Sequence, residues 1–301
     1  MRKLVMLLAL FWAPLVHALS PYVQGDSLAP GDVQRLQQQV AGKLSAAGLK
    51  VVGRYTPSGL SDYGVVVATD ADVLNAIRDI GGNSIVGAAV RVGVKSDGSV
   101  SYINPEYWYR AFFGKKFDRH QKAVKSLESR LKQALGDKGT FGGDVPQDTL
   151  AGYRYMFGLE SFSDPTLLKS HASFDAAISA VRKNLSAGER QTRQVYEVVL
   201  PDKQLAVFGV AMNDRSTGDG AWVNKLIPDY IAALPYELFV VGKDVYTLHP
   251  RYRIAISWPA LTMGTFLKIG NTPTEILGTL TPVAGGTSRA AAGRAFHDEW
   301  F

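Results

Sequence analysis

Two arginines near the C-terminal end of the chain are the residues whose type and spacing best suit ligand chemistry. Arg251 and Arg253 follow His249, and residues 251–258 read as an extended strand. Alternate residues of a strand share one face, so both arginines and Ser257 would project from the same side. Guanidinium groups hold carboxylates and phosphates through paired hydrogen bonds. The pattern therefore predicts a pocket for a small molecule, and the arginines suggest an anionic one.

The predicted ligand site also takes residues from two other stretches of the chain. Tyr236 and Glu237 stand on the preceding predicted strand, and residues 104–108 occupy a similar place earlier in the chain. The earlier stretch contributes the candidates Asn104, Glu106, Tyr107 and Trp108. In the alternative interpretation the arginines form an exposed sheet face paired with Glu237, which is the more common arrangement of charged residues on a strand.

The sequence shows no catalytic or metal-binding motif. The histidines beyond the N-terminal segment lack the H-x-x-x-H spacing of a zinc site; they are His120, His171, His249 and His297. No G-x-S-x-G motif occurs, and the absence of cysteine removes thiolate nucleophiles and thiolate metal ligands. We therefore predict no catalytic residue, no metal and no cofactor.

The elements that would position these residues follow from hydrophobic periodicity and turn residues. Apolar residues three or four apart from Val33 to Ala47 predict a helix that Gly48 ends, and Asp70 is placed to cap a second helix. Asp97-Gly98 predicts a hairpin turn, because glycine adopts positive φ readily. The first half is expected to contain helices 32–47, 70–80 and 117–135 and strands 49–55, 64–69, 88–95 and 99–103.

The order helix, strand, strand returns in the second half. Ser173 is placed to cap a helix that closes at Gly188, and Pro228 is expected to kink or split a helix over 219–233. The expected elements are helices 173–188, 219–233 and 262–269 and strands 194–200, 205–212, 236–241, 244–248 and 251–258. Residues 153–157 are aromatic enough for a stacking surface, but packing against a neighbouring helix is the simpler interpretation.

Two pairs of segments match at nearly constant separation. Residues 40–46 match 181–187 at an offset of 141, and residues 100–107 match 245–252 at an offset of 145. The second pair shares a strand, a polar residue, a proline and a tyrosine in fixed register. Because both pairs fall at the same place in a repeated order of elements, we predict an internal duplication.

The first half resembles the domain-of-unknown-function 302 family over about residues 32–135. The resemblance rests on residues 90–94, the turn Asp97-Gly98, residues 100–102 and the stretch Asn104-Pro-Glu-Tyr107-Trp108, which would open a helix. It implies a small α/β sandwich, an antiparallel sheet covered by helices, in a family with no established activity. The second copy departs from the pattern, because His249 replaces the asparagine and a strand is expected to follow it.

The expected fold class is α+β, with two tandem small α/β sandwich modules that are each an antiparallel sheet covered by helices. Without cysteines, each module has to be stabilised by its hydrophobic core. The expected boundaries are a signal peptide at 1–18, a flexible lead-in at 19–31, a first module at 32–135, a connecting segment at 136–172, a second module at 173–281 and a flexible tail at 282–301.

The N-terminus predicts export to the periplasm. Arg2 and Lys3 precede an apolar run over residues 4–15, and small residues lead to a predicted cleavage after Ala18. The run is shorter than the roughly 20 apolar residues of a spanning helix, and no later segment is apolar enough to replace it, so no transmembrane anchor is expected after cleavage. Removing residues 1–18 leaves 31 basic and 27 acidic residues, a formal net charge of +4. Because the basic residues are not clustered, nucleic acid is not an expected partner.

The leading hypothesis is a periplasmic small-molecule binding or accessory protein, since ligand sites favour the clefts where lobes meet. The sequence specifies neither the ligand nor partner proteins nor the oligomeric state. The alternatives are an envelope hydrolase with His249 as general base and a structural interaction module. Buried convergent arginines would favour binding, a histidine–carboxylate pair beside a serine or water would favour the hydrolase, and an exposed apolar patch without a pocket would favour the interaction module.

Overall fold

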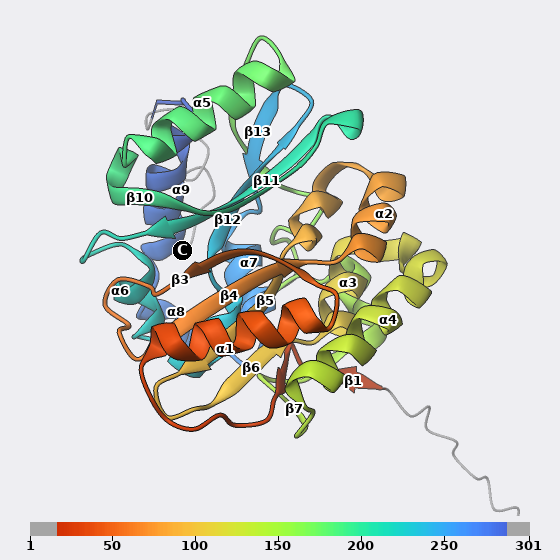
Figure 1. Cartoon of the computed structure of the whole chain (residues 1–301). Helices are drawn as coiled ribbons and strands as arrows, with labels where there is room; N and C mark the ends of the chain where they lie inside the picture. The colour runs from red at the N-terminus through yellow and green to blue at the C-terminus, as the bar shows by residue number, and fades with distance from the viewer. Residues whose placement is uncertain (1–16, 288–301) are drawn as a thin grey trace, which may run out of the picture.

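The computed structural model describes residues 17–287, which form the α+β fold expected from the sequence (Figure 1). Three antiparallel sheets of six, five and two strands carry helices packed on them. Residues 1–16 of the expected signal peptide at 1–18 and the chain from residue 288 lie outside the described residues. Among residues 17–287, no helix is long and apolar enough to cross a bilayer.

The first half of the chain forms the six-stranded sheet, with the order β3-β4-β5-β6-β2-β7. Its strands are β2 (Tyr22–Gln24), β3 (Lys50–Tyr55), β4 (Tyr63–Thr69), β5 (Val90–Lys95), β6 (Val100–Ile103) and β7 (Thr140–Phe141). Its helical segments are α1 (Val33–Ala46), α2 (Ala71–Ile80), η1 (Gly82–Ala88), α3 (Pro105–Phe113), η2 (Gly114–Lys116) and α4 (Phe117–Leu135). The two-stranded sheet of β1 (Ala18–Leu19) and β8 (Val145–Pro146) and the segment η3 (Gln147–Gly152) complete this half.

Capping residues explain where the helices of the first half begin. The Asp32 carboxylate accepts hydrogen bonds from backbone N–H groups in the first turn of α1, which is the usual role of an N-terminal cap. Asp70 caps α2 in the same way, through the N–H of Val73, and also pairs with Arg130 of α4. The cap predicted from the sequence at Asp70 is therefore confirmed.

The second half forms the five-stranded sheet, with the order β10-β11-β12-β13-β9. Its strands are β9 (Thr166–Ser170), β10 (Thr192–Leu200), β11 (Leu205–Met212), β12 (Tyr236–Val241) and β13 (Asp244–Thr247). Its helical segments are α5 (Phe174–Ser186), η4 (Glu189–Gln191), η5 (Pro201–Lys203), α6 (Asp219–Val223), η6 (Pro228–Ala233), α7 (Pro250–Ser257), α8 (Met263–Leu267) and α9 (Thr272–Val283).

The two larger sheets are built from elements in the same order. Apart from the one-turn segments η4 and η5, β2-α1-β3-β4-α2-η1-β5-β6-α3 in the first half matches β9-α5-β10-β11-α6-η6-β12-β13-α7 in the second. The order of strands within the sheets also matches, with β2 beside β6 and β9 beside β13. Both sheets have a register irregularity in the first strand of this order, between Val51 and Gly53 in β3 and between Gln194 and Tyr196 in β10.

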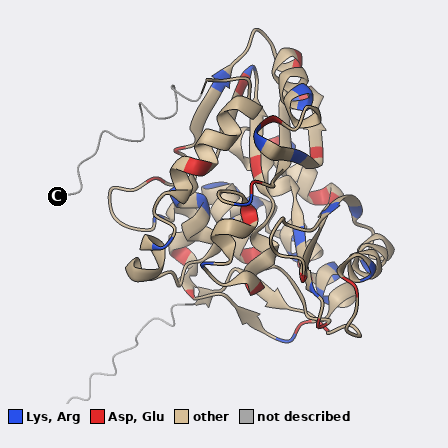
Figure 2. Ribbon diagram, turned by 90° about the vertical axis from the view of Figure 1, so that its left-hand side faces the viewer, with Lys and Arg blue, Asp and Glu red and all other residues tan. Residues whose placement is uncertain are grey.

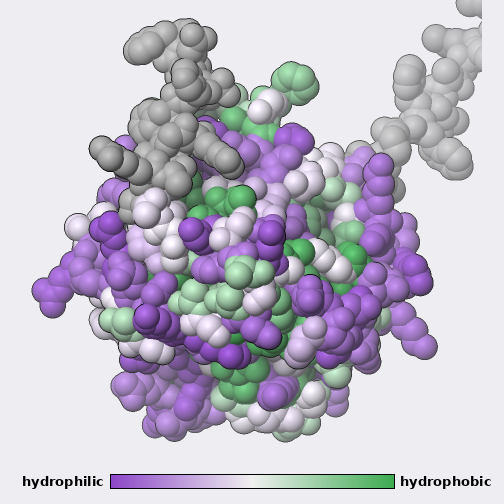
Figure 3. All heavy atoms as spheres, turned by 90° about the horizontal axis from the view of Figure 1, so that it is seen from above, coloured by the Kyte–Doolittle hydropathy of each residue, from purple (hydrophilic) through white to green (hydrophobic). Residues whose placement is uncertain are grey.

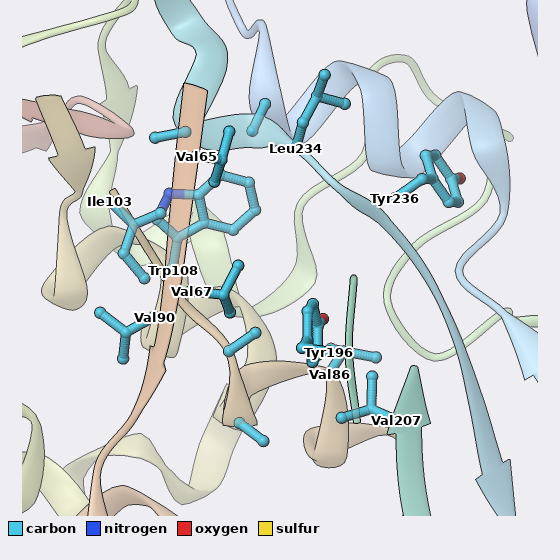
Figure 4. Packing of buried hydrophobic residues seen from close by; sticks show 14 of the residues in the cluster. Val65, Val67, Val86, Val90, Ile103, Trp108, Tyr196, Val207, Leu234 and Tyr236 are labelled. Atoms are coloured by element: carbon cyan, nitrogen blue, oxygen red, sulfur yellow. The ribbon is translucent and has the colours of Figure 1, made fainter. Parts of the chain in front are cut away.

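Each half supplies a 3-10 segment that packs on the sheet of the other half. η1 packs against β11 and β12, whereas η6 packs against β4, β5 and β6. Figure 4 shows Val86 of η1 beside Val207 of β11, and Leu234, which follows η6, beside Val65 of β4. The buried apolar residues of both halves belong to one continuous cluster, so the halves share a core.

Residues 250–257 form the helix α7, so the prediction of a strand over 251–258 is wrong. Pro250 is the first helical residue, a position where the missing N–H of proline costs nothing. Every residue from Tyr252 to Ser257 is buried. A helix buried on all sides has no amphipathic period, and the alternation of polar and apolar types therefore resembled a strand.

Three expected boundaries also differ from the structure. Part of the expected flexible lead-in forms β2, which lies inside the first sheet between β6 and β7. β9 comes from the expected connecting segment and forms an edge of the second sheet. α9 continues to Val283, beyond the expected start of the flexible tail at 282. The split expected near Pro228 is confirmed, since α6 and η6 are separate segments.

Candidate functional site

The helix α7 sends the two candidate arginines to different surroundings. Residues two apart on a helix point about 200° apart around its axis, whereas on a strand they would share a face. The side chain of Arg253 is 3% exposed, and that of Arg251 is 35% exposed. The structure therefore does not bring the two guanidinium groups to one pocket.

Arg253 belongs to a buried group of polar side chains, the junction cluster, formed by Arg91, Glu237, Arg253 and Ser257. Arg253 Nε donates to Glu237 Oε1 at 2.7 Å, and Arg91 Nη2 donates to Glu237 Oε2 at 2.7 Å. Arg253 also donates to the Ser257 hydroxyl and, at 2.6 Å, to the carbonyl oxygen of Ala233. The cluster joins β5 of the first half to β12 and α7 of the second.

Aromatic rings surround the junction cluster. The guanidinium carbon of Arg253 lies 5.5 Å from the ring centroids of both Trp108 and Tyr236, within the range of a cation–π interaction. Although burial alone would lower the pKa of Arg253, the Glu237 carboxylate raises it, so the guanidinium stays charged. Burial raises the pKa of the neighbouring Tyr196 to about 12. Because these side chains are inaccessible to solvent and occupied with one another, the cluster connects the halves and offers no surface to a ligand.

The candidate residues 104–108 hold the N-terminal strand and α7 in place. Asn104 Nδ2 donates to the carbonyl oxygen of Ser20 at 2.9 Å, and Trp108 Nε1 donates to that of Pro21 at 2.8 Å. The Tyr107 hydroxyl donates to the carbonyl oxygen of Ile256 in α7 at 2.8 Å. In addition, the partly exposed Glu106 pairs with Arg110 one turn later in α3.

The remaining candidates, His249 and Arg251, meet at a residue that the sequence did not single out, Glu160. His249 Nε2 lies 3.3 Å from Glu160 Oε1, and Arg251 Nε donates to Glu160 Oε2 at 3.2 Å. Although partial burial alone would raise the pKa of Glu160, Arg251 and His249 lower it. Burial lowers the pKa of His249 from its ordinary value of 6.5. At neutral pH the three side chains therefore carry one positive and one negative charge.

Arg251 forms part of the wall of a hollow of about 300 Å³, the apolar hollow. Its lining consists of Tyr155, Met156, Leu159, Arg251, Met263, Phe266 and Leu267. The rings of Tyr155 and Phe266 stack with centroids 5.9 Å apart. Two elements therefore build the hollow against α7: the segment before Glu160 and α8.

Exposed apolar side chains gather around the apolar hollow. Six large hydrophobic side chains are exposed among residues 17–287, and Met156, Met263 and Leu267 of the lining are three of them. A fourth, Phe157, follows Met156 and is fully exposed. Apart from Arg251, the sequence signal for this place was the aromatic content of residues 153–157, for which the sequence analysis favoured packing. Figure 3 shows one face of the molecule, on which hydrophilic and hydrophobic side chains are mixed, and Figure 2 shows charges of both signs interspersed along the chain.

A second hollow, the junction pocket, lies between the first sheet and η6 and has a volume of about 230 Å³. Its lining consists of Gln24, Tyr63, Gly93, Val94, Lys95, Ser99, Ser101, Phe141, Ile227, Asp229, Tyr230 and Ile231. None of the candidate residues predicted from the sequence is among them. Sequence patterns did not indicate this pocket, because it forms only when the two halves come together.

The geometry provides no constellation for a bound metal. Within residues 17–287, no three histidine, aspartate or glutamate side chains lie close enough together to hold an ion. His249 does pair with a carboxylate, but its Nδ1 is buried without a hydrogen-bond partner and the residue is not part of the lining of the apolar hollow.

No protein-family model, curated protein or solved structure matches this chain. Its function has to be inferred from its own residues. Among the hollows of the described chain, the apolar hollow is lined mainly by apolar side chains, and the junction pocket lies between the two halves. The apolar hollow contains one predicted residue, Arg251, and the junction pocket contains none.

Proposed function

We propose that this chain is an exported binding protein that holds a small, uncharged, mainly apolar molecule in the apolar hollow. The observation that carries the proposal is the gathering of exposed apolar side chains around a concave site of about 300 Å³. That volume lies at the lower end of the roughly 300–1,000 Å³ typical of ligand sites. Exposed apolar side chains that gather at one place mark interaction sites, because covering them removes apolar surface from water.

The charges around the apolar hollow favour a neutral ligand. Arg251 is the only charged residue of the lining, and Glu160 already balances it. With its pKa lowered, His249 adds no second positive charge to the lining at neutral pH. Arg251 uses Nε and Nη2 for Glu160, which leaves the N–H groups of Nη1 to donate to a carbonyl or hydroxyl oxygen of the ligand. The anionic ligand suggested by the sequence therefore gives way to an uncharged molecule with an acceptor at one end.

The second part of the proposal is that the chain is exported and related to the domain-of-unknown-function 302 family. The basic pair Arg2 and Lys3, the apolar run and the small residues before the predicted cleavage after Ala18 support secretion to the periplasm. The Asn104-Pro-Glu-Tyr107-Trp108 stretch that supports the family relationship opens α3 after a hairpin.

Internal duplication is the third part of the proposal. The equal order of elements and of strands in the two larger sheets supports it. The His249-Pro250 pair opens α7 as Asn104-Pro105 opens α3, and the hairpin precedes the helix in both halves. Residues at matching positions also meet across the junction: Arg91 binds Glu237, and Arg253 lies over Trp108. Such meetings are what a twofold relation between two related halves produces.

The two alternative functions depend on the same region. A hydrolase would need His249 to reach a substrate, yet Nε2 of His249 faces Glu160 and Nδ1 is buried. An interaction module would place an apolar side chain of a partner protein, rather than a free molecule, in the apolar hollow. The concave shape and its enclosing walls favour the free molecule.

A matched pair of fluorescent probes tests the proposal on the purified protein. N-phenyl-1-naphthylamine is neutral, and 8-anilino-1-naphthalenesulfonate has the same rings with one added sulfonate. We expect the neutral probe to bind more tightly, and Leu267→Ser to weaken its binding about five- to tenfold through lost apolar contact. Leu167→Ser removes another exposed leucine, on β9 and away from the hollow, and is expected to leave binding unchanged.

Three results would overturn the proposal: no saturable binding of the neutral probe, tighter binding of the sulfonate, or equal effects of the two leucine substitutions. Phe266→Ala provides a second variant, because it removes the ring that stacks on Tyr155. Competition by a peptide but by no small molecule would favour the interaction module.

A further inference from the structure

The junction pocket is separate from the apolar hollow, and the two linings share no residue. Five strands of the first sheet line it from one side: β2, β4, β5, β6 and β7. Residues of η6 and Ile227, which belong to the second half, line it from the other. A ligand in this pocket would therefore touch both halves of the chain.

In the second sheet, aromatic rings fill the position that matches the junction pocket. In the first sheet Gly93 of β5 pairs with Ser101 of β6, and at the matching place in the second sheet Phe239 of β12 pairs with Tyr246 of β13. The rings of Phe239 and Tyr246 stack with centroids 5.7 Å apart, and Phe239 is fully buried. Two rings in one sheet thus correspond to a glycine and a serine in the other.

The strand registers establish that the positions match. Val94 pairs with Val100 in the first hairpin, and Val240 pairs with Val245 in the second. Gly93 precedes Val94, and Ser101 follows Val100. In the second hairpin, Phe239 precedes Val240 in the same way, and Tyr246 follows Val245. The two small residues of the first sheet act differently. Gly93 allows close approach of Ile231, and Ser101 leaves space beside it.

The floor of the junction pocket offers neutral polar groups. Gln24 Nε2 donates to the carbonyl oxygen of Val100 at 2.9 Å, which leaves the side-chain oxygen of Gln24 as an acceptor. The hydroxyl group of Ser101 forms no side-chain hydrogen bond to another residue in the described range 17–287. These groups are available to a ligand that both donates and accepts hydrogen bonds.

Aromatic rings form the walls of the pocket, and paired charges form its rim. Phe141 and Tyr230 lie with ring centroids 5.6 Å apart. Lys95 Nζ lies 3.4 Å from Asp229 and 3.3 Å from Asp97, and the Tyr63 hydroxyl donates to Asp229 at 2.9 Å. Since the single cation already has two carboxylate partners, the rim gives no net attraction to an anion.

We infer that the junction pocket binds a neutral, hydroxyl-rich molecule the size of a single sugar ring. Such a molecule has apolar C–H faces that suit the aromatic walls and hydroxyl edges that match the hydroxyl, amide and charged groups of the floor and rim. The volume of about 230 Å³ is below that of sites for drug-sized ligands, which favours one ring over a nucleotide or a disaccharide. Because both halves line the pocket, binding also stabilises their contact.

Neutral and charged sugars of equal size test this assignment. D-glucose, D-galactose and myo-inositol are titrated into the purified full chain and followed by thermal shift and by NMR line broadening of the sugar; D-glucuronate and D-glucosamine serve as charged counterparts. We expect at least one neutral compound to raise the Tm, because a ligand that binds only the folded state stabilises it. The charged counterpart of that compound should bind more weakly.

Substitutions at Ser101 locate the site. Ser101→Tyr introduces the residue type that stands at the matching position in the second sheet, and we expect it to abolish sugar binding by filling the pocket. Ser101→Ala keeps the space and removes one hydrogen bond, so binding should weaken about fivefold. Ser170→Ala on β9 is the control and should bind like the unsubstituted protein.

The assignment is overturned if none of the three neutral compounds binds, if the charged counterparts bind more tightly, or if folded Ser101→Tyr binds like the unsubstituted protein. Should Ser101→Tyr fail to fold, Ser101→Ala decides the same question, and unchanged binding by it refutes the site. Leu267→Ser should leave sugar binding intact, so failure at the apolar hollow and failure here give different results.

Discussion

Matching positions of the two larger sheets face each other, and the residues at these positions carry opposite charges. Arg91 pairs with Val67 across β5 and β4, and Glu237 pairs with Gly209 across β12 and β11. Two arginines or two glutamates at these buried positions would repel each other. The unlike pair instead forms a 2.7 Å ion pair between the halves. Where two similar halves touch, their difference in charge makes the contact favourable.

A second difference concerns space rather than charge. Phe239 and Tyr246 fill their position in the second sheet. In the first sheet Ile231 of η6 lies against Gly93, and the small side chain of Ser101 leaves space in the junction pocket. The same backbone arrangement thus gives a packed core in one half and an accessible hollow in the other. At this position, the residues of the second sheet stabilise the core, whereas those of the first sheet leave a surface on which a ligand could bind.

The largest expected effect comes from removing the carboxylate that the two guanidinium groups share. Glu237→Gln leaves Arg91 and Arg253 buried without a counter-charge, so we expect a loss at the upper end of the roughly 3–5 kcal/mol typical of a broken buried pair. Urea unfolding measures it. The control is Glu197→Gln, whose partner Arg182 is half exposed and which should cost below about 1 kcal/mol.

Arg91→Met sharpens the same comparison from the other sheet. It removes one of two cations from a cluster with a single carboxylate, and Glu237 keeps its pairing with Arg253. The loss should therefore be clearly smaller than that of Glu237→Gln, since replacing part of a buried ionic group by an apolar side chain is often nearly neutral. Equal losses for the two substitutions would contradict the unequal charges assigned to the junction cluster.

The sequence predicted most of the fold, because the helices with one exposed face show a helical period and the buried strands are short apolar runs bounded by turn residues. α1, α4 and α5 follow their helical periods, and the β5–β6 and β12–β13 hairpins follow their turn residues. α7 was predicted wrongly for a physical reason: both halves bury it, and burial on all sides removes the pattern on which such predictions depend.

The candidate site was harder to predict than the fold. The sequence alternative that paired the arginines with Glu237 as an exposed face named the right partner for Arg253, but the pair is buried. Glu160 lies about 90 positions before Arg251 in the sequence. The two residues come together only in the folded chain. Nothing local in sequence encodes such a meeting.

The two halves also differ in the partners of a buried aspartate, which is Asp70 after β4 in the first half and Asp219 after β11 in the second. Asp70 of the first half pairs with Arg130. Asp219 of the second half has no basic partner among residues 17–287, and it accepts hydrogen bonds from the Tyr55 hydroxyl at 3.3 Å and from the Met212 N–H at 3.1 Å. Burial raises the pKa of Asp219 to about 7, against the lowering effect of those hydrogen bonds. Stability should therefore depend on pH through Asp219.

The direction of this pH dependence follows from the pKa of Asp219 in the folded and in the unfolded state. An aspartate in the unfolded chain has a pKa of about 3.9, so between about pH 4 and pH 7 only the unfolded state has lost the proton. The contribution of Asp219 to stability is fully present below about pH 4, falls as the pH rises, and levels off above pH 7, with a total change of up to about 4 kcal/mol. Urea unfolding from pH 4 to pH 8 measures it. Asp219→Asn should remove this slope, and an unchanged slope would refute the assignment.

A further substitution tests how tightly the halves meet at Gly93. A β-carbon at Gly93 would lie 2.3 Å from Cγ2 of Ile231 in η6, although the matching position in the second sheet carries the ring of Phe239. We expect Gly93→Ala to destabilise the protein by about 1–3 kcal/mol through overpacking. Gly42→Ala on α1 is the control: a β-carbon there meets nothing within 4 Å, and alanine should stabilise the helix by about 0.5–1 kcal/mol. Similar unfolding free energies for both variants would show that η6 yields easily, and would remove the rigid wall that the junction pocket requires.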